Sequence, residues 1–585
     1  MICADGRVVA QRGIVVSKLS ADRIFVGDSD GTGFDFTGGG KPLTALPAIL
    51  TALNATYTRN STKNVVQNGA LVSLSANQFG TSYDPVAAQY GYVPEPAATN
   101  LCTNSDGNAS TYTVSNVSDG TAVPGFTNGL AFGNNSVQRS ATKSISVTSG
   151  TAYSISFFVI MDDAGAPVVG TTNSTGDFSI ALNAVIATTK LERLIGSNVY
   201  RVSASITAGA TSSQAAGIIK YTGQSARTFR VTGIQVETGL RATSYIATTG
   251  STASRSADAL TVPLWINNVK DSQDGSTANW TRTNCTVTTS GTAPDGTATA
   301  QLVTALSTAA TTLINTSTKA PSTTVTHSVY VKSGNKATCT LILRNTTTAT
   351  NFTTGTLTFA TGVITGAGWT ATDVGGGWFR CVFTQSTGIS IGDTLSCYTQ
   401  TTGGTWNAGD TGYFWGAQIE PGSVATAYRP TTSTLESAAN ANITGFSSAG
   451  YTLFVDGRFD VQTSTERGLV SIDDGTANNR AQIRQNASNT VTTAVVSGGV
   501  AQASNAEASV GIARYRAAYS VSANSFIRAV NGVAGTADTA GSMPVLPTTL
   551  QLGKNHATDY CNGFIFRAQL ITQALTQAQI NGLTT

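Results

Sequence analysis

The segment Gly416-Ala-Gln-Ile-Glu-Pro-Gly-Ser-Val-Ala-Thr-Ala-Tyr428 decides the fold of this chain, because it occurs a second time as Gly233-Ile-Gln-Val-Glu-Thr-Gly-Leu-Arg-Ala-Thr-Ser-Tyr245. The two copies share their Gly, Gln, Glu, Gly, Ala, Thr and Tyr positions in the same order. A match of that density indicates a duplicated unit. Each copy begins with a run rich in aromatic and branched residues, which predicts a strand, and each run stops at a glycine turn.

The polar residues of the repeated motif allow two interpretations. Gln235 and Glu237, with Gln418 and Glu420 in the second copy, either form a polar site or hold the end of a strand by hydrogen bonds. We favour the second interpretation, because a pattern kept in two copies fits a folding requirement as well as a site.

The composition favours an all-β protein with little helix. Only 11% of the 585 residues are charged, against roughly 25% in an ordinary globular domain, and 60 residues are glycine. The net charge of +3 is spread thinly, without the basic runs that neutralise phosphates, so we expect no nucleic-acid partner. No apolar run approaches the roughly 18 residues that a membrane helix needs, so we expect no membrane insertion.

The seven cysteines are odd in number, scattered and without a C-x-x-C pair. We expect free thiols that pack as small apolar residues, in a chain assembled in a reducing cytoplasm.

Residues 1–44 alternate apolar and polar but are too few to bury a core of their own. They predict a short β-rich arm that needs a partner surface. Asp28, Asp30 and Asp35 lie in this arm and could bind Ca2+ through oxygen, although an Asp/Gly turn explains them more simply. No other cofactor is expected.

Catalytic patterns are weak in this sequence. The chain has two histidines, His327 and His556, and neither sits in a nucleophile motif. The densest acidic group of the last domain could supply a glycosidase carboxylate pair. Calcium ligands and solvated loop edges are the competing interpretations, and we favour the solvated loop edges. This group comprises Asp456, Asp460, Asp473 and Asp474. We expect a protein that is not an enzyme.

A leader precedes the first copy of the duplicated unit. Its order is a Thr-Arg-x-Ser start at residues 58–61, a Tyr-Asp-Pro turn at 83–85, and Pro-Ala-Ala-Thr-Asn-Leu at 96–101. This order resembles the leader of tailed-bacteriophage virion proteins, which stands ahead of a carbohydrate-binding-module-like jelly roll. The repeated motif resembles the final strand of those jelly rolls.

The resemblance implies tandem antiparallel β-sandwich (jelly-roll) domains, followed by a C-terminal lectin-like sandwich and a short C-terminal helix. The last part is similar to concanavalin-A-like, laminin-G-type domains. Asn531-Gly532 predicts a type I′ hairpin there, and Thr576 with Gln579 predicts a helix capping box. The expected units are an attachment arm (1–44), a connector (45–100), two jelly rolls (101–260 and 261–436) and the lectin-like domain (437–585).

The same resemblance implies a structural virion protein, such as a tail fibre, spike or head decoration protein. We expect it to be assembled in the host cytoplasm, to contact other virion proteins and to bind host-surface glycan. Residues 1–44 would join the chain into a homotrimer. A polysaccharide depolymerase tailspike and a purely architectural virion protein are the alternatives.

All six tryptophans lie between residues 261 and 436. Trp369 and Trp406 stand in glycine-rich segments, and an exposed ring beside Asn407 and Asp410 could stack on a sugar. Burial of both rings against a loop base or a neighbouring domain is the alternative, and it is slightly favoured.

Overall fold

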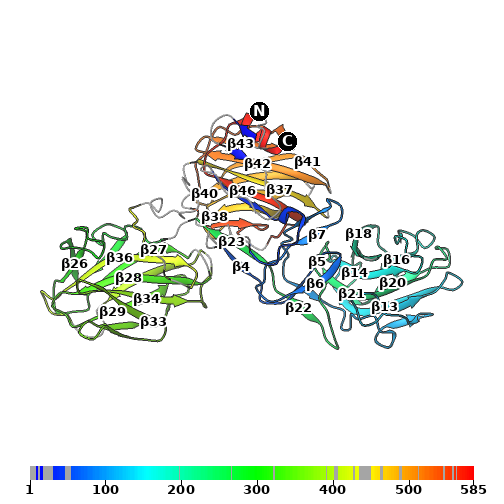
Figure 1. Ribbon diagram of the computed structural model, residues 1–585, viewed down its shortest axis with the longest axis horizontal. Coiled ribbons are helices and arrows are strands. Elements are labelled where there is room, and N and C mark those ends of the chain that lie inside the picture. The colour runs from blue at the N-terminus through cyan, green and yellow to red at the C-terminus, as the bar shows by residue number, and fades with distance from the viewer. Residues whose placement is uncertain are drawn as a thin grey trace.

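The computed structural model is all-β, with many antiparallel sheets and one short helix at the C-terminus, which confirms the predicted fold class. It has three lobes, each built on a β-sandwich (Figure 1). The structure describes residues 8–10, 14–16, 31–46, 55–196, 198–264, 267–320, 323–390, 392–400, 406–423, 425, 428–433, 450–460, 466–486, 490–511, 513–544, 547, 549–556, 559–561 and 563–585.

The first jelly roll packs two six-stranded sheets around a core that includes Phe157, Phe178 and Phe229. One sheet comprises β10 (Thr113–Ser115), β13 (Arg139–Val147), β20 (Ser212–Lys220), β16 (Phe178–Leu182), β15 (Val169–Gly170) and β17 (Val185–Ile186). The other comprises β11 (Ser118–Asp119), β12 (Leu130–Phe132), β21 (Phe229–Thr238), β14 (Ala152–Met161), β19 (Val199–Thr207) and β18 (Thr189–Gly196).

The second jelly roll repeats this plan around a core that includes Trp280, Phe383 and Phe414. Its seven-stranded sheet comprises β24 (Trp280–Thr283), β27 (Thr312–Lys319), β35 (Thr394–Gln400), β29 (Thr338–Asn345), β31 (Gly355–Thr358), β32 (Val363–Thr365) and β30 (Thr350–Asn351). Its six-stranded sheet comprises β25 (Cys285–Thr289), β26 (Gln301–Ala305), β36 (Thr411–Pro421), β28 (Val325–Ser333), β34 (Trp378–Gln385) and β33 (Trp369–Gly375).

The third sandwich, which we call the hub sandwich, contains the C-terminal strands and three strands from elsewhere in the chain. One sheet comprises β3 (Gly31–Asp35), β46 (Gly563–Ile571), β37 (Gly450–Phe459), β42 (Arg514–Ser522), β43 (Ser525–Val530) and β44 (Val533–Ala534). The other comprises β4 (Thr56–Thr58), β23 (Ala259–Pro263), β45 (Thr549–Leu552), β38 (Arg467–Asp473), β39 (Arg480–Gln485), β40 (Thr490–Ser497) and β41 (Val500–Ser509).

Short ladders and turns complete the fold. The two-stranded ladders are β1 (Val8–Ala10) with β2 (Ile14–Val16), β5 (Lys63–Gln67) with β6 (Ala70–Leu74), β7 (Ser82–Asp84) with β8 (Gln89–Gly91), and β9 (Ala98–Asn100) with β22 (Ala253–Arg255). The 3-10 turns are η1 (Gly38–Gly40) and η2 (Ala109–Thr111).

Both local predictions for the C-terminal region are confirmed. Helix α2 (Gln577–Thr584) begins with the capping box of Thr576 and Gln579. The turn between β43 and β44 has positive φ at both Asn531 and Gly532, as a type I′ hairpin requires.

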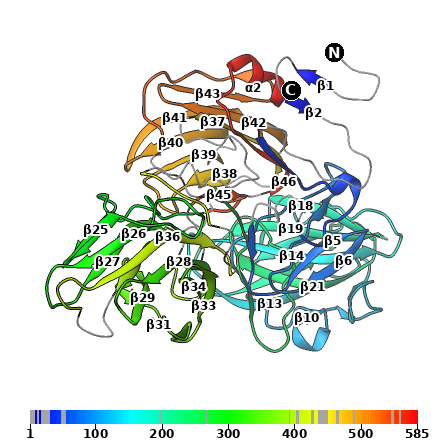
Figure 2. The same cartoon turned by 60° about the vertical axis from the view of Figure 1, so that its left-hand side comes forward.

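The strand pairing corrects the expected domain boundaries. β3 belongs to the predicted arm, yet it pairs with β46, and β4 and β23 extend the opposite sheet through β45. The hub sandwich is therefore discontinuous in sequence, and the first jelly roll is inserted between β9 and β22. Figure 2 shows β3 as a blue strand beside β46. Since residues 31–35 find their partner strand within the chain, their lack of a core is no reason for a trimer.

The repeated motif has a structural role in both copies. Gly233 and Gly416 have φ of 60° and 64°, and each lies at a bulge of its own strand, where two residues face one residue of the neighbouring strand. In the first copy, the Glu237 carboxylate accepts hydrogen bonds from Gln235 Nε2 (2.7 Å) and from the backbone N–H of Thr243. In the second, Gln418 Nε2 donates to the corresponding glutamate at 2.9 Å. The strand-end interpretation is confirmed.

An asparagine fixes the first residues of each jelly roll to this final strand. The Asn100 side chain accepts from the N–H groups of Cys102 and Val236 at 3.0 and 3.1 Å. Asn267 accepts in the same way from Val269 and Ile419, at 3.0 and 3.4 Å. These asparagine hydrogen bonds place the first residues of the two jelly rolls at about 100 and 267.

The cysteines in the described part of the chain are free and buried, as predicted. They are Cys102, Cys285, Cys339, Cys381, Cys397 and Cys561. Burial raises the pKa of the Cys339 and Cys397 thiols to about 12, so these groups stay protonated at neutral pH. Cys3 lies outside the described residues.

A chain of buried ion pairs joins the leader, the hub sandwich and the first jelly roll. Arg458 contacts Asp84 through two nitrogens at 2.5 and 2.9 Å, and contacts Asp460 at 2.5 Å. Asp460 in turn pairs with Arg241 of the first jelly roll at 2.9 Å. All four side chains are at most 6% exposed, so the removal of one leaves its partners charged and without water.

We predict that Arg458→Met destabilises the protein by about 3–5 kcal/mol, because Asp84 and Asp460 lose a buried counter-charge. Arg567→Met is the control, since Arg567 is 57% exposed and 3.5 Å from Asp35, and such pairs contribute about 0–1 kcal/mol. Urea unfolding measures both changes. Equal effects of the two substitutions would contradict a structural role for the buried chain.

Candidate functional site

Trp369 is a core residue, in agreement with the slightly favoured interpretation of burial and not with an exposed sugar-binding ring. It begins β33, is 6% exposed, and stacks on Phe383 with ring centroids 5.1 Å apart. Its indole N–H donates to the Thr353 carbonyl at 2.7 Å. Sequence alone did not show which residues cover this ring, because they come from separate strands.

Trp406, Asn407 and Asp410 do lie together, but the indole is 5% exposed, so this ring is also buried, in agreement with the slightly favoured interpretation. Asp410 accepts from the Asn407 N–H at 2.7 Å and pairs with Lys336 at 3.0 Å. The Asn407 hydrogen bond and the Lys336 charge lower the pKa of Asp410. Asp410 thus closes the turn after Trp406.

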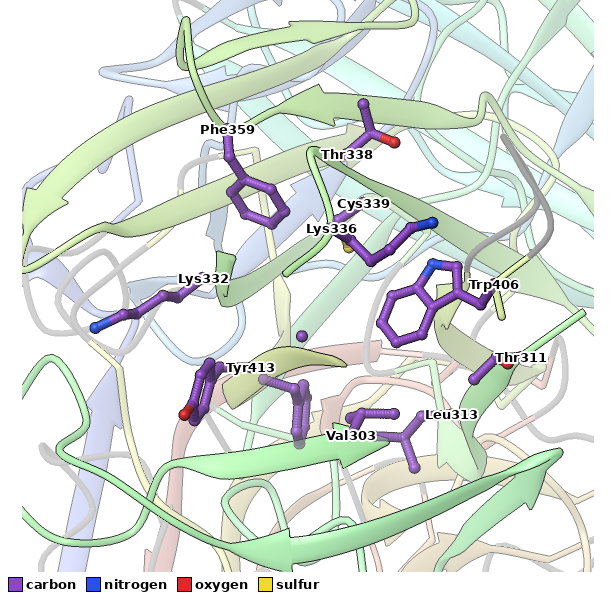
Figure 3. Close-up of a pocket in the computed structure, with 12 residues that line it drawn as sticks. Val303, Thr311, Leu313, Lys332, Lys336, Thr338, Cys339, Phe359, Trp406 and Tyr413 are labelled. Carbon is purple, nitrogen blue, oxygen red and sulfur yellow. The ribbon is translucent and has the colours of Figure 1, made fainter. Parts of the chain in front are cut away.

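Trp406 forms one wall of a small cavity between the two sheets of the second jelly roll (Figure 3). The cavity has a volume of about 30 Å³ and an apolar lining that includes Val303, Leu313, Phe359 and Phe414. It has room for one or two waters, while ligand pockets measure about 300–1,000 Å³. A sugar ring does not fit inside it.

Tyr413 and Lys332 also line this cavity, and both are partly exposed. They lie on the same side of the cavity, away from Trp406 and Lys336 (Figure 3). The Lys332 ammonium is 5.9 Å from the centre of the Tyr413 ring. These two residues therefore present an aromatic ring and a hydrogen-bond donor to solvent at one place.

Tyr413 belongs to a larger cluster that includes Tyr330, Trp378, Trp415 and Tyr428, which we call the aromatic face. The two indoles are buried and anchored, because Trp378 donates to the Thr292 carbonyl at 3.2 Å and Trp415 to Thr299 Oγ1 at 2.9 Å. The three tyrosines are partly exposed above them. A rigid base thus holds accessible phenol rings.

The aromatic face has a counterpart on the first jelly roll, where it is covered. Phe158 and Tyr245 there pack against Val66 and Leu71 of the β5–β6 hairpin. In both rolls an arginine from the neighbouring strand lies over the ring: Arg201 over Phe158 and Arg380 over Tyr330, each donating to a serine hydroxyl at 3.0 Å.

Sequence reasoning missed Tyr413 and Lys332. The alternation Tyr330-Val-Lys332 within β28 places both polar side chains on the side away from the core residue Val331, and the same holds for Tyr413 beside Phe414. That alternation was the available signal. The glycine-rich context of Trp369 and Trp406 instead made these two rings the candidates for a sugar site.

The acidic group of the last domain is buried, so its interpretation as a solvated loop edge is wrong. Asp456 and Asp460 are each 1% exposed and pair with arginines. Asp473 accepts from Gln551 Nε2 at 2.7 Å, and burial raises its pKa, although these hydrogen bonds oppose the shift. Asp474 accepts from Thr476 and Asn479. All four carboxylates serve the packing of the hub sandwich.

The tentative calcium site finds no support in the described part of the chain. Asp35 accepts from the Thr37 N–H and hydroxyl at 2.8 and 2.6 Å, which is the geometry of a polar turn. Asp28 and Asp30 lie outside the described residues. Among the described residues, no group of three or more His, Cys, Asp or Glu side chains could hold a metal ion. None of the described helices is long and apolar enough to cross a membrane.

No protein-family model matches the chain, and comparison with curated proteins finds no match. Solved structures that are similar include the NanB sialidase of Streptococcus pneumoniae, at 16% identity and a TM-score of 0.21, covering 23% of this chain and 24% of the sialidase. The CBM40 of a Ruminococcus gnavus IT-sialidase is 13% identical, with a TM-score of 0.21, and covers 23% of this chain and 84% of its own. Domain 4 of the arabinanase AbnA of Geobacillus stearothermophilus, in complex with arabinotriose, is 14% identical, with a TM-score of 0.20. The match covers 23% of this chain and 67% of the arabinanase chain.

His327 makes the second jelly roll sensitive to acid. It is 1% exposed beside Trp369, and neither ring nitrogen has a hydrogen-bond partner among the residues that the structure describes. Burial lowers its pKa to about 4, from an ordinary value of 6.5. The folded state therefore favours the neutral ring. The free energy of unfolding decreases as the pH falls from about 6.5 towards about 4, because the unfolded chain binds the proton more readily.

We predict that His327→Leu removes this decrease in the free energy of unfolding, which is roughly 1.4 kcal/mol per pH unit between the two pKa values. Urea unfolding at a series of pH values measures the effect, with tryptophan fluorescence as the signal because every tryptophan belongs to residues 261–436. Parallel pH profiles for the wild type and the variant would contradict the assignment.

Proposed function

We propose that this protein is a structural component of a tailed-phage virion, and that its second jelly roll binds host-surface glycan at the aromatic face. The observation that carries the glycan part is the pair Tyr413 and Lys332, partly exposed above anchored tryptophans. A sugar presents C–H groups on its ring face and hydroxyls at its edge. A flat phenol matches the former, and an ammonium donates to the latter.

The difference between the two jelly rolls supports this location. The counterpart face of the first roll is covered by the β5–β6 hairpin, whereas the tyrosines of the second are partly open to solvent. Duplication followed by a change in one copy leaves one roll as a structural support and the other with an accessible surface. The virion part of the proposal rests on the leader and motif resemblance.

Two alternatives stay open to test. A purely architectural virion protein would use the aromatic face only to pack on neighbouring proteins. A depolymerase would release reducing ends from host polysaccharide. We expect no such release, because the four acidic side chains considered for this chemistry are buried in ion pairs and hydrogen bonds. Assembly as a homotrimer and location in the virion remain predictions.

We predict that the purified full chain binds bacterial surface glycans on an array, and that Tyr413→Ala weakens the binding by about tenfold or more, because a central aromatic contact contributes more than ~1 kcal/mol. Lys332→Ala should weaken it in the same direction. Tyr221→Ala is the matched control, as Tyr221 is a partly exposed tyrosine of the first jelly roll.

The controls separate the candidate functions. Equal loss of binding in the Tyr413 and Tyr221 variants would place the site elsewhere. Absence of binding to both the array and intact host cells would support the architectural alternative. Newly formed reducing ends would support the depolymerase.

A further inference from the structure

Three buried side chains from distant segments meet where the leader joins the hub sandwich. The Lys63 ammonium of β5 is 2.5 Å from Asp258 Oδ2 and 3.2 Å from Glu95 Oε2. Each of the three side chains is at most 3% exposed. A nucleophilic nitrogen, an electrophilic carboxyl and a second carboxylate are thus held together away from water.

We propose that Lys63 and Asp258 become joined by an isopeptide bond, with Glu95 carrying the proton. This proposal does not depend on the glycan site. It rests on the arrangement of the three side chains and on the groups that surround them.

The reaction is a condensation that needs no oxidant, reductant or cofactor. Glu95 accepts a proton from the Lys63 ammonium, and the freed Nζ lone pair attacks Cγ of Asp258. The Cγ–Oδ2 bond then breaks, and Oδ2 leaves as water after receiving the proton from Glu95 and the second proton lost by Nζ. One ammonium and one carboxylate thus become one neutral amide and one water.

The surroundings of Asp258 suit this step. The Tyr57 hydroxyl donates to Oδ1 at 2.7 Å, and the guanidinium groups of Arg59 and Arg255 lie 3.8 and 3.9 Å from the same oxygen. These groups can stabilise negative charge that develops on Oδ1 when nitrogen attacks. The backbone N–H of Glu95 donates to Oδ2 at 3.1 Å and helps to orient the carboxyl.

Glu95 is placed to exchange a proton with Lys63. It accepts from the Ser244 N–H and hydroxyl at 2.8 and 2.6 Å, and Arg255 is 3.4 Å away. Burial alone would raise its pKa, but the charges of Lys63 and Arg255 outweigh burial and hold the pKa well below its usual range. Glu95 is therefore ionised but a weak base, so the proton resides on it only transiently, across the 3.2 Å contact with the Lys63 ammonium. Condensation also removes a buried ion pair, whose desolvation is costly.

The bond would close a covalent loop around the whole first jelly roll. Lys63 precedes this insertion and Asp258 follows it, immediately before β23 of the hub sandwich. A cross-link there would keep the leader and β23 together even if the hub sandwich opened. Closure of a long loop restricts the unfolded chain strongly.

Mass spectrometry of the purified full chain tests the proposal. The expected result is an intact mass lower than the sequence mass by one water, and a tryptic peptide in which the Lys63 and Asp258 segments are linked. Lys220 is an internal control, because it is fully buried but donates to the carbonyls of Asp177, Ser225 and Arg227. Its peptide should be unlinked.

Glu95→Gln tests the proton carrier, since it keeps the size of the side chain and removes its basic carboxylate. We expect the linked peptide to disappear, and the two segments to be recovered separately from folded protein. A wild-type digest in which these segments are always separate would overturn the proposal. Equal linkage in the Glu95→Gln variant would overturn the role of Glu95.

Discussion

Buried charges in the hub sandwich and the leader constrain the architecture of this protein. Arg458 binds Asp84 and Asp460, and Asp460 binds Arg241, so one row of charges connects three parts of the chain that are distant in sequence. A second group contains Lys63, Glu95, Arg255 and Asp258. If the segments that carry either group moved apart, charged side chains would be left buried without a partner, which is costly. The charges therefore specify which segments meet, in addition to the apolar cores that stabilise each sandwich.

This constraint explains why the leader motifs have their form. Arg59 of the Thr-Arg-x-Ser start donates to Tyr57 and to the carbonyls of Ser61 and Ser75. Asp84 of the Tyr-Asp-Pro turn binds Arg458, and the asparagine of the Thr-Asn-Leu end clamps the first strand of the jelly roll. Each motif positions backbone at a junction.

Local patterns of the sequence were sufficient to predict the fold class, the duplicated unit, the Asn531-Gly532 turn and the capping box of α2. Each depends on residues close together in the chain. The discontinuous hub sandwich was missed because β3, β4 and β23 are short, and their partners β45 and β46 lie hundreds of residues away. The residues that bury Trp369 could not be identified for the same reason, since Phe383 and His327 reach it from other strands.

The discontinuous hub sandwich requires that β4 and β23 are strands and not connectors. Hydrogen exchange of the full chain, read by mass spectrometry on peptides that contain residues 56–58, 259–263 and 549–552, measures whether they are. Since β23 lies between β4 and β45, we expect its amides to exchange as slowly as those of β45, with β4 next. Exchange of residues 259–263 at the rate of an unstructured linker, beside a protected β45, would contradict the account.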